Sequence, residues 1–365
     1  MSEKLWKDVL KLYVKAGAYP FPTTDTMLEI LKLFITEEQA EFLLNFRKSS
    51  YNLEQIKEKI KMDETVLQEK LDELAFIGAL TKIPSRSTGI MVYRMPPFFP
   101  GLLEFTLMKP SRTEKDYKIA RLWENFFNEM VDYTQINYDK FVSLLEESKM
   151  SLERIVPVES EIKTKDEIIL STNELSKFIE EQESIGLATC YCRNRKDLLD
   201  DPCKKTKVRK NCFAFSKTAD FLISQGFAEK ISKEEAIRIL RECEDSGLIH
   251  KAFHARLDPK KEIDAICNCC DCCCGTFSVH FAGGIPLMSQ SSFIAVVNEE
   301  NCVGCGTCVE FCNAAAIELE DAVAKVIDDR CLGCGICGHH CPEDAITLNA
   351  VETRRVFVPP PRIKN

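Results

Sequence analysis

Eight cysteines near the C-terminal end of this 365-residue sequence follow a spacing that suits metal-cluster chemistry. They form two runs of C-x2-C-x2-C-x3-C, and each cysteine of the first run has a counterpart 29 positions later. Three thiols in one tight loop can bind three irons of a 4Fe-4S cube, and in paired runs the fourth cysteine binds the cube of the other run. The expected ligands are Cys302, Cys305, Cys308 and Cys341 for one cluster, and Cys331, Cys334, Cys337 and Cys312 for the other.

The residues between these cysteines support the same interpretation. Glycines permit positive φ and a close approach of the backbone to a cluster. Both runs contain them, at Gly304, Gly306, Gly333 and Gly335. Pro342 follows the last cysteine of the second run, whereas Asn313 follows the last cysteine of the first, so the two turns can differ. A zinc site takes its ligands as two pairs and leaves this triple spacing unexplained.

The segment Phe293–Ala350, which carries both runs, resembles the bacterial dicluster ferredoxin family. The resemblance implies a small pseudo-twofold β-α-β module that transfers single electrons at low potential. Phe293–Val297 and Ala322–Ile327 are expected to be the short strands that precede each cysteine loop. The apolar residues Ile317 and Ile346, again 29 positions apart, are expected to close the two halves.

A second group of ten cysteines precedes this segment. They are Cys190, Cys192, Cys203, Cys212, Cys267, Cys269, Cys270, Cys272, Cys273 and Cys274. Ten thiols are enough for one or two further 4Fe-4S clusters. Adjacent residues of a strand point to opposite faces, so Cys269 and Cys270 are expected to serve different clusters, and so are Cys272 and Cys273. The region resembles, less specifically, a cysteine-rich iron–sulfur domain found upstream of dicluster ferredoxin modules in anaerobes.

Two alternatives for these ten cysteines stay open. Structural zinc is less favoured than iron–sulfur clusters, and its expected ligands are Cys190, Cys192, Cys203 and Cys212. Disulfides are disfavoured because no secretory signal is visible and thiols of a cytoplasmic protein stay reduced.

Several neighbouring residues are not expected to be ligands. Cys243 belongs to an apolar helical face with Ala236, Ile239 and Leu240, where a cysteine acts as a small buried hydrophobic residue. His339 and His340 are expected beside a cluster or at the surface.

The basic run Lys204–Lys210 has three open interpretations. It can offset the negative charge of a neighbouring cluster, dock an acidic redox partner, or be a solvated loop.

The N-terminal part has helix-start patterns at Thr36, Asn52 and Asp63, the first of them for a helix through Phe46. A hairpin is expected from Leu80–Ile83 and Ile90–Tyr93, and three helices followed by a hairpin resemble a winged-helix domain. The third helix carries a net charge of −4, which opposes contact with phosphates. We therefore expect protein docking or a purely architectural role, and no nucleic-acid binding.

Residues 95–189 carry no chemical motif. The expected elements are a proline-rich connector at Met95–Gly101, helices near 115–130 and 138–147, strands at Arg154–Val158 and Glu167–Leu170, and a helix opened by a capping box at Ser171–Glu174. The aromatic positions of the two longer helices are expected to be core, and the tail from Val356 to Pro361 is expected to be an extended arm.

Composition limits the class of protein. The net charge is −9, no stretch has the length and apolarity of a membrane span, and all 19 cysteines lie between Cys190 and Cys341. These features predict a cytoplasmic protein from an anaerobic setting.

The expected fold is α+β and multidomain. The domains are a winged-helix-like domain at 1–110, a helical and mixed connecting region at 111–189, an α/β cysteine-rich metal-binding domain at 190–285, a dicluster ferredoxin domain at 290–350 and a proline-rich tail at 351–365.

The expected function is electron transfer by several iron–sulfur clusters between redox partner proteins, with no catalytic residues of its own. The sequence has no G-x-G-x-x-G dinucleotide fingerprint, so substrate chemistry is expected on another subunit. A redox-sensing winged-helix transcription regulator is one alternative, and an oxidoreductase subunit with an open cluster site is another.

Overall fold

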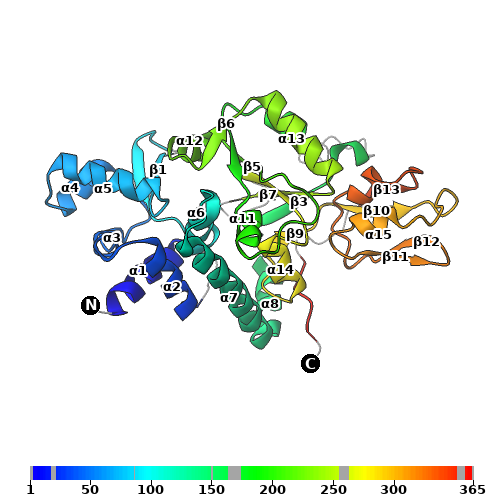
Figure 1. The fold of residues 1–365 in the computed structure, drawn as a ribbon, viewed down its shortest axis with the longest axis horizontal. Coiled ribbons are helices and arrows are strands. Elements are labelled where there is room, and N and C mark those ends of the chain that lie inside the picture. Colours follow the sequence, from blue (N-terminus) through cyan, green and yellow to red (C-terminus); the bar gives the residue numbers. More distant parts are fainter. Residues whose placement is uncertain are drawn as a thin grey trace.

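The structure is a computed structural model that describes residues 3–17, 22–85, 87–148, 151–162, 174–254, 263–351 and 358–363. Figure 1 shows three parts along the long axis of the molecule. Helices of the N-terminal third lie at one end, a mixed sheet lies in the middle, and a small unit of short strands and helices lies at the other end. The mixture of helices and sheets agrees with the α+β expectation.

The N-terminal part contains helices and one hairpin. These elements are α1 (Glu3–Ala16), α2 (Asp25–Phe34), α3 (Glu37–Leu43), α4 (Leu53–Lys59), α5 (Glu64–Phe76), β1 (Thr81–Pro84) and β2 (Met91–Arg94). Helices α3, α4 and α5 begin after Thr36, Asn52 and Asp63, whose side chains accept hydrogen bonds from backbone N–H groups of the first turn. The three predicted starts are thus confirmed, although α3 ends at Leu43 instead of Phe46. The hairpin is also confirmed, with both strands beginning one residue later than predicted.

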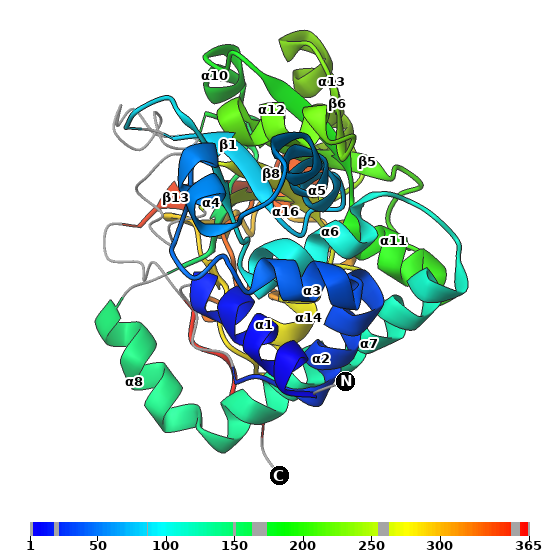
Figure 2. The ribbon, with the colours of Figure 1, turned by 90° about the vertical axis from the view of Figure 1, so that its left-hand side faces the viewer.

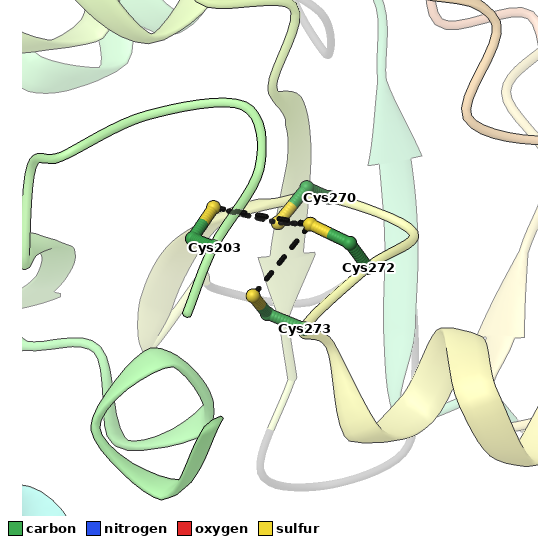
Figure 3. A group of neighbouring side chains, drawn as sticks. All are labelled: Cys203, Cys270, Cys272 and Cys273. Atoms are coloured by element: carbon green, nitrogen blue, oxygen red, sulfur yellow. Dashed lines mark hydrogen bonds between the residues drawn. The ribbon is translucent and has the colours of Figure 1, made fainter. Parts of the chain in front are cut away.

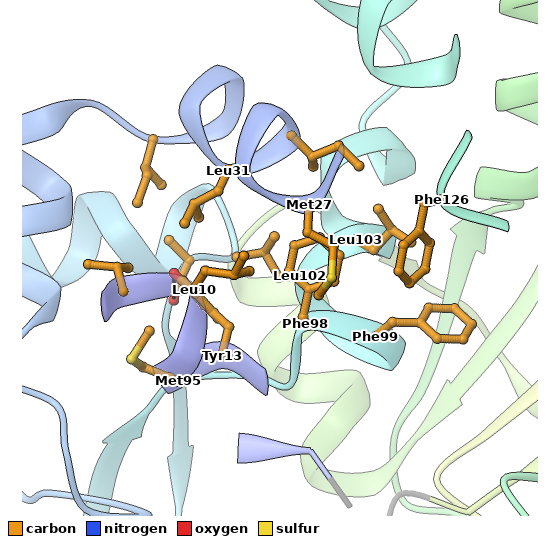
Figure 4. Packing of buried hydrophobic residues seen from close by; sticks show 14 of the residues in the cluster. Leu10, Tyr13, Met27, Leu31, Met95, Phe98, Phe99, Leu102, Leu103 and Phe126 are labelled. Atoms are coloured by element: carbon orange, nitrogen blue, oxygen red, sulfur yellow. Dashed lines mark hydrogen bonds between the residues drawn. The ribbon is translucent and has the colours of Figure 1, made fainter. Parts of the chain in front are cut away.

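Helices α1 and α2 are absent from the sequence-based expectation. Thr24 caps α2 by accepting a hydrogen bond from the Met27 N–H at 3.2 Å, a signal that could have predicted this helix. Figure 4 shows Leu10 and Tyr13 of α1 gathered with residues of α2 and of the segment around Phe98. In Figure 2, which looks onto the N-terminal end, the helices α1–α5 lie in front of the sheet.

A longer helical layer connects this end to the sheet. It contains α6 (Leu103–Met108), α7 (Glu114–Ile136) and α8 (Tyr138–Ser148), preceded by the helical turn η1 (Phe98–Leu102), in which Phe99 and Pro100 are extended. The predicted aromatic stripe is confirmed as core, since Phe126, Phe127, Met130, Phe141 and Leu145 are all buried. The hydrophobic cluster that begins at α1 continues to Val279, Ile285 and Leu287, in and after α14, so the N-terminal part packs against a helix beside the sheet.

In the described part of the chain, the central sheet has seven strands in the order β6-β4-β5-β8-β7-β3-β9. Their bounds are β3 (Glu153–Val156), β4 (Ile185–Thr189), β5 (Lys210–Phe215), β6 (Ala228–Lys230), β7 (Ile249–Phe253), β8 (Ala265–Cys269) and β9 (Met288–Ser289). All neighbours are antiparallel except β3 and β9. The sheet therefore joins strands from both sides of residue 190, where a boundary was expected. The strand predicted at Glu167–Leu170 lies outside the described residues.

Helices pack against this sheet. They are α10 (Leu175–Glu180), α11 (Tyr191–Leu198), α12 (Ser216–Ser224), α13 (Lys233–Asp245) and α14 (Gly275–Phe281). On α13 the residues Ala236, Ile239, Leu240 and Cys243 are buried, as the helical spacing predicted. Helix α10 begins at Leu175, and the capping residue proposed for it, Ser171, lies outside the described residues.

The C-terminal segment, residues 293–350, has two short antiparallel sheets. Strand β10 (Phe293–Val297) pairs with β13 (Ile346–Ala350), and β11 (Ile317–Glu320) pairs with β12 (Val323–Val326). Helices α15 (Thr307–Phe311) and α16 (Ile336–His339) follow the two cysteine loops. Both predicted strands are present, and the duplicated layout reproduces the 29-residue repeat of the sequence.

Residues 358–363 run without regular structure across the junction of α7 and α8. The Gln135 side chain donates to the Pro361 carbonyl at 3.3 Å and accepts from the Ile363 N–H at 3.1 Å. The described part of the tail therefore packs on the body of the chain. Among the helices of the described residues, none combines the length and the apolar character needed to cross a membrane.

Candidate metal centres

The first cysteine set of the C-terminal segment surrounds one cavity. Cys302, Cys305 and Cys308 come from the loop before and the start of α15, and Cys341 comes from the turn after α16. Together they line one partly open cavity. The structure thus brings together the four residues that the sequence assigns to one cluster, including the cysteine from the other run.

The glycines of the two loops leave room that a side chain would fill. Gly304 has φ +68°, and a Cβ there would lie 2.2 Å from the Ala322 carbonyl oxygen. Gly333 has φ +69°, and a Cβ there would lie 2.1 Å from the Phe293 carbonyl oxygen. Only glycine fits positions with positive φ and such close backbone contact, so each loop is held against the strand beside it.

Backbone N–H groups point at several of these sulfurs. The Ala316 N–H donates to Cys312 Sγ at 3.2 Å, and the Ala345 N–H donates to Cys341 Sγ at 3.3 Å. Donors of this kind stabilise thiolates and tune the potential of a bound cluster. The donor set, the cavity and the glycine loops all fit a 4Fe-4S cube.

The second cysteine set is more deeply buried than the first. It consists of Cys312, Cys331, Cys334 and Cys337. Burial raises the pKa of Cys334 to about 12 and raises the pKa of Cys337 well above its usual value. In contrast, the first set reaches the surface, where Cys305 is exposed and the neighbouring Val303 is 63% exposed.

The second set faces the central sheet. The Val158 N–H donates to the Cys334 carbonyl at 2.9 Å. Asn313 accepts from the Asp271 N–H at 3.1 Å and donates to the Gly247 carbonyl at 2.8 Å. These contacts fix the side of the C-terminal segment that carries the second set against the cysteine-rich part of the sheet.

Asn313 was not expected to be a docking residue. It occupies the position that corresponds to Pro342 in the other half, and this departure from the repeat was the one sequence signal. The turns after Cys312 and Cys341 therefore have different roles. The Asn313 side chain, in the turn after Cys312, forms hydrogen bonds with loops beside the central sheet.

The two histidines and the basic run also lie at this junction. His339 and His340 contact the end of α13, through the Asp245 carboxylate and the Glu244 carbonyl, each at 3.0 Å. Lys205 donates to the Glu310 carbonyl at 2.9 Å, and its charge lies close enough to Cys312 to affect that thiol. The position of Lys205 favours charge compensation at a neighbouring cluster among the three interpretations of the basic run.

Six of the ten upstream cysteines line a second cavity. This six-thiol group consists of Cys190, Cys192, Cys212, Cys267, Cys269 and Cys274. Its residues come from the end of β4, from α11, from the paired strands β5 and β8, and from the residue before α14. Cys212 and Cys267 stand directly opposite each other in the sheet register.

Neighbouring thiols of the six-thiol group interact with one another. Each thiol contacts the next one in the series Cys190, Cys212, Cys267, Cys269, Cys274 and Cys192. Contacts with the thiols of Cys267 and Cys274, together with burial, raise the pKa of Cys269 well above its usual value. Metal binding to such a group must therefore be accompanied by release of protons.

A buried ion pair borders the six-thiol group. Lys251 Nζ lies 2.6 Å from Glu153 Oε2 and 3.2 Å from Cys274 Sγ. Burial alone would lower the pKa of Lys251, but the negative charge that Cys269, Cys274 and Glu153 carry when ionised raises it well above its usual value. The ammonium group therefore places a fixed positive charge where thiolates gather.

The other four upstream cysteines form a compact four-thiol group (Figure 3). Its members are Cys203, Cys270, Cys272 and Cys273, and their sulfurs all lie within 4.8 Å of one another. Arg193 is buried beside them and donates to Cys203 Sγ at 3.4 Å and to Cys270 Sγ at 3.5 Å.

The division of the ten cysteines partly follows the expectation. Cys269 and Cys270 fall in different groups, as predicted for neighbours in a strand. The prediction for Cys272 and Cys273 is wrong, because both belong to the four-thiol group. Strand β8 ends at Cys269, and the following residues form a turn in which side chains no longer alternate between two faces.

The four cysteines that the zinc alternative names as ligands do not lie together in the structure. Cys190, Cys192 and Cys212 line the larger cavity, whereas Cys203 belongs to the four-thiol group. The spacing along the chain could not indicate this, because the loop that carries Cys203 turns back toward residues 270–273.

The model of the 4Fe-4S dicluster domain family matches residues 295–348. The match supports the C-terminal ferredoxin module that the cysteine spacing predicted. No curated protein and no solved structure matches the chain. The dicluster domain and the upstream cysteine groups indicate an iron–sulfur protein suited to electron transfer.

Proposed function

We propose that this chain relays single electrons between redox partner proteins through a series of iron–sulfur clusters. The observation that carries the proposal is the orientation of the dicluster domain. Its buried second cysteine set faces the sheet that holds the six-thiol group, and its first set opens to the surface at Cys305. Such an order suits a path from an interior centre to a partner at the surface.

The proposed ligands follow the two sets described above. Cys302, Cys305, Cys308 and Cys341 hold the outer cluster, and Cys312, Cys331, Cys334 and Cys337 hold the inner one. When bound, 4Fe-4S clusters supply one-electron chemistry at potentials set by burial, charge and hydrogen bonds to sulfur. The protein contributes N–H donors, the charge of Lys205 and a dry setting for the inner cluster.

The six-thiol group is proposed to hold a third iron–sulfur cluster. Its thiols line one cavity, as those of the outer set do, and its six thiols exceed the four that a cube requires. Lys251 compensates part of the negative charge that a cluster with thiolate ligands brings into the interior.

The N-terminal helices and hairpin are proposed to be a winged-helix-like adapter for a partner protein. The lysine of α5, Lys70, forms an ion pair with Glu38, and Lys82 of the hairpin forms one with Asp72 at 2.8 Å. Cations already engaged with carboxylates are poorly placed to bind phosphates. A gel-shift assay of the holoprotein at physiological salt tests this point, and tight specific DNA binding would favour the regulator alternative.

The relay itself is tested by metal counting and redox titration of protein purified without oxygen, in keeping with the proposed anaerobic, cytoplasmic setting. We expect about twelve irons and twelve sulfides per chain, from three cubes. Electron paramagnetic resonance during stepwise reduction should resolve three one-electron centres. Colourless protein would overturn the proposal, and about eight irons would remove the third cluster from it.

A further inference from the structure

The four-thiol group differs in size from the cysteine sets assigned to iron–sulfur cubes. Its sulfurs are 3.7 Å apart between Cys203 and Cys270, 3.9 Å between Cys203 and Cys272, and 3.5 Å between Cys270 and Cys272. The separation between Cys272 and Cys273 is 3.6 Å. At a zinc–sulfur bond length of about 2.3 Å, the sulfurs of a regular tetrahedron lie about 3.8 Å apart. The group therefore already has the dimensions of a shell around one ion.

A four-iron cube needs a wider arrangement. Irons and sulfides stand between its outer thiolates and keep them apart. Among the described residues, the four-thiol group is the one set of three or more thiol, imidazole or carboxylate groups whose ligand atoms all lie within 4.8 Å of each other. The cysteines of the C-terminal segment, all of them described, do not meet this criterion although they match a dicluster family.

From this geometry we propose that Cys203, Cys270, Cys272 and Cys273 bind a single zinc ion in a closed, tetrahedral, structural site. Four thiolates fill the coordination shell and leave no open position for substrate. The site stands apart from the iron–sulfur relay, because it contains no residue of the six-thiol group or of the C-terminal segment.

The surroundings of the group suit such an ion. Four thiolates outweigh the charge of one zinc ion, and the excess must be compensated in a buried setting. Arg193 is 1% exposed and supplies a guanidinium that bonds two of the sulfurs. A third bond, to Asn211 Oδ1 at 2.8 Å, fixes the orientation of the guanidinium.

The proposed ion would join two segments that position the dicluster domain. Cys203 belongs to the loop after α11, and this loop carries Lys205, which bonds the Glu310 carbonyl. The other three ligands flank Asp271, whose N–H bonds Asn313. Closing this loop on one ion reduces the conformational freedom of both docking contacts.

Metal analysis of the full chain, purified without oxygen from cells grown with zinc and iron, tests the site. We expect about one zinc per chain in addition to the iron, and X-ray absorption at the zinc edge should show four sulfurs at about 2.3 Å. Iron in place of zinc, or zinc with nitrogen or oxygen ligands, would overturn the proposal.

Substitutions separate this site from the relay. Cys203→Ser should lose the zinc and keep the iron, whereas the matched control Cys243→Ser, at a buried cysteine of neither group, should keep both. A fall of about four irons in Cys203→Ser would instead assign the group to a cube. If Cys203→Ser does not fold, the absorption spectrum of the unaltered protein still decides the question. Zinc and iron are counted separately, so failure of the zinc site and failure of the iron–sulfur relay are distinguishable.

Discussion

The C-terminal segment and the cysteine-rich part of the sheet arrange their proposed metal ligands in opposite ways. In the C-terminal segment, three cysteines of each set come from one short loop. Glycines in that loop allow its backbone to pack closely against a neighbouring strand. In the sheet region, the thiols of the six-thiol group come from α11, β5, β8, the residue after β4 and the residue before α14. Local sites can be recognised from spacing, whereas distributed sites depend on the tertiary fold.

The largest effect is expected from a ligand of the distributed site. Cys269→Ala removes the thiol that contacts both Cys267 and Cys274 and so interrupts the set of contacting thiols that is proposed to hold the cluster. We expect loss of about four irons and a lower unfolding temperature, because metal binding there is coupled to folding. Iron counting and calorimetry check this.

The comparison predicts a milder result for the local site. Cys305→Ala removes an exposed ligand of the outer cluster and should cost about four irons at most, while the unfolding temperature of the sheet stays unchanged. Equal losses of stability in the two variants would contradict the distinction between distributed and local sites.

A glycine substitution tests the local site in another way. Gly333→Ala places a Cβ 2.1 Å from the Phe293 carbonyl oxygen at positive φ, so we expect a cost above about 3 kcal/mol and loss of the inner cluster. Gly226→Ala is the control, because its φ is +71° but a Cβ there meets nothing within 4 Å. That variant should lose only about 1 kcal/mol in denaturant unfolding and keep its iron.

The junction between the two regions is tested at Asn313. Asn313→Ala removes hydrogen bonds to the Asp271 N–H and the Gly247 carbonyl and leaves both groups without that partner. We expect a loss of about 1–3 kcal/mol in stability and slower electron exchange between the sheet centre and the dicluster domain, at unchanged iron content. Asn301→Ala, an exposed asparagine of the same segment, is the control. An unchanged exchange rate in rapid-mixing experiments would contradict the docking role.

The smallest effect concerns a buried carboxyl group near the sheet region. Burial raises the pKa of Glu104 to about 7 from an ordinary value of 4.5. The unfolded chain then releases this proton at lower pH than the folded chain, so stability falls as pH rises from 4.5 to about 7. Between pH 6 and 8 the loss should be about 1 kcal/mol, and Glu104→Gln should remove that part of the pH dependence. Parallel pH profiles of the two proteins in denaturant unfolding would show that Glu104 is not the cause.

Sequence reasoning succeeded where the information is local. The repeated spacing predicted the dicluster module, and side chains such as Thr36 and Asn52 marked helix starts because capping involves residues three positions apart. The helical face of Cys243 was correct for the same reason. Helices α1 and α2 were missed, although Thr24 offered a cap of the same kind.

The division of the ten upstream cysteines could not be predicted. It depends on the pairing of β5 with β8 and on a loop that returns Cys203 to the turn after Cys269. Neither contact leaves a periodic pattern in the sequence. The docking role of Asn313 was equally hidden, since its partners Gly247 and Asp271 lie far away along the chain.

The two thiol groups are covalently linked at two places in the chain, which affects how they can take up metal. Cys269 and Cys270 are consecutive residues that belong to different thiol groups, and the same is true of Cys273 and Cys274. When one cysteine of a pair binds a metal ion, the adjacent cysteine can adopt fewer conformations than it can in the metal-free chain. We therefore expect metal binding at the two groups to be coupled, so that filling one group changes the affinity of the other.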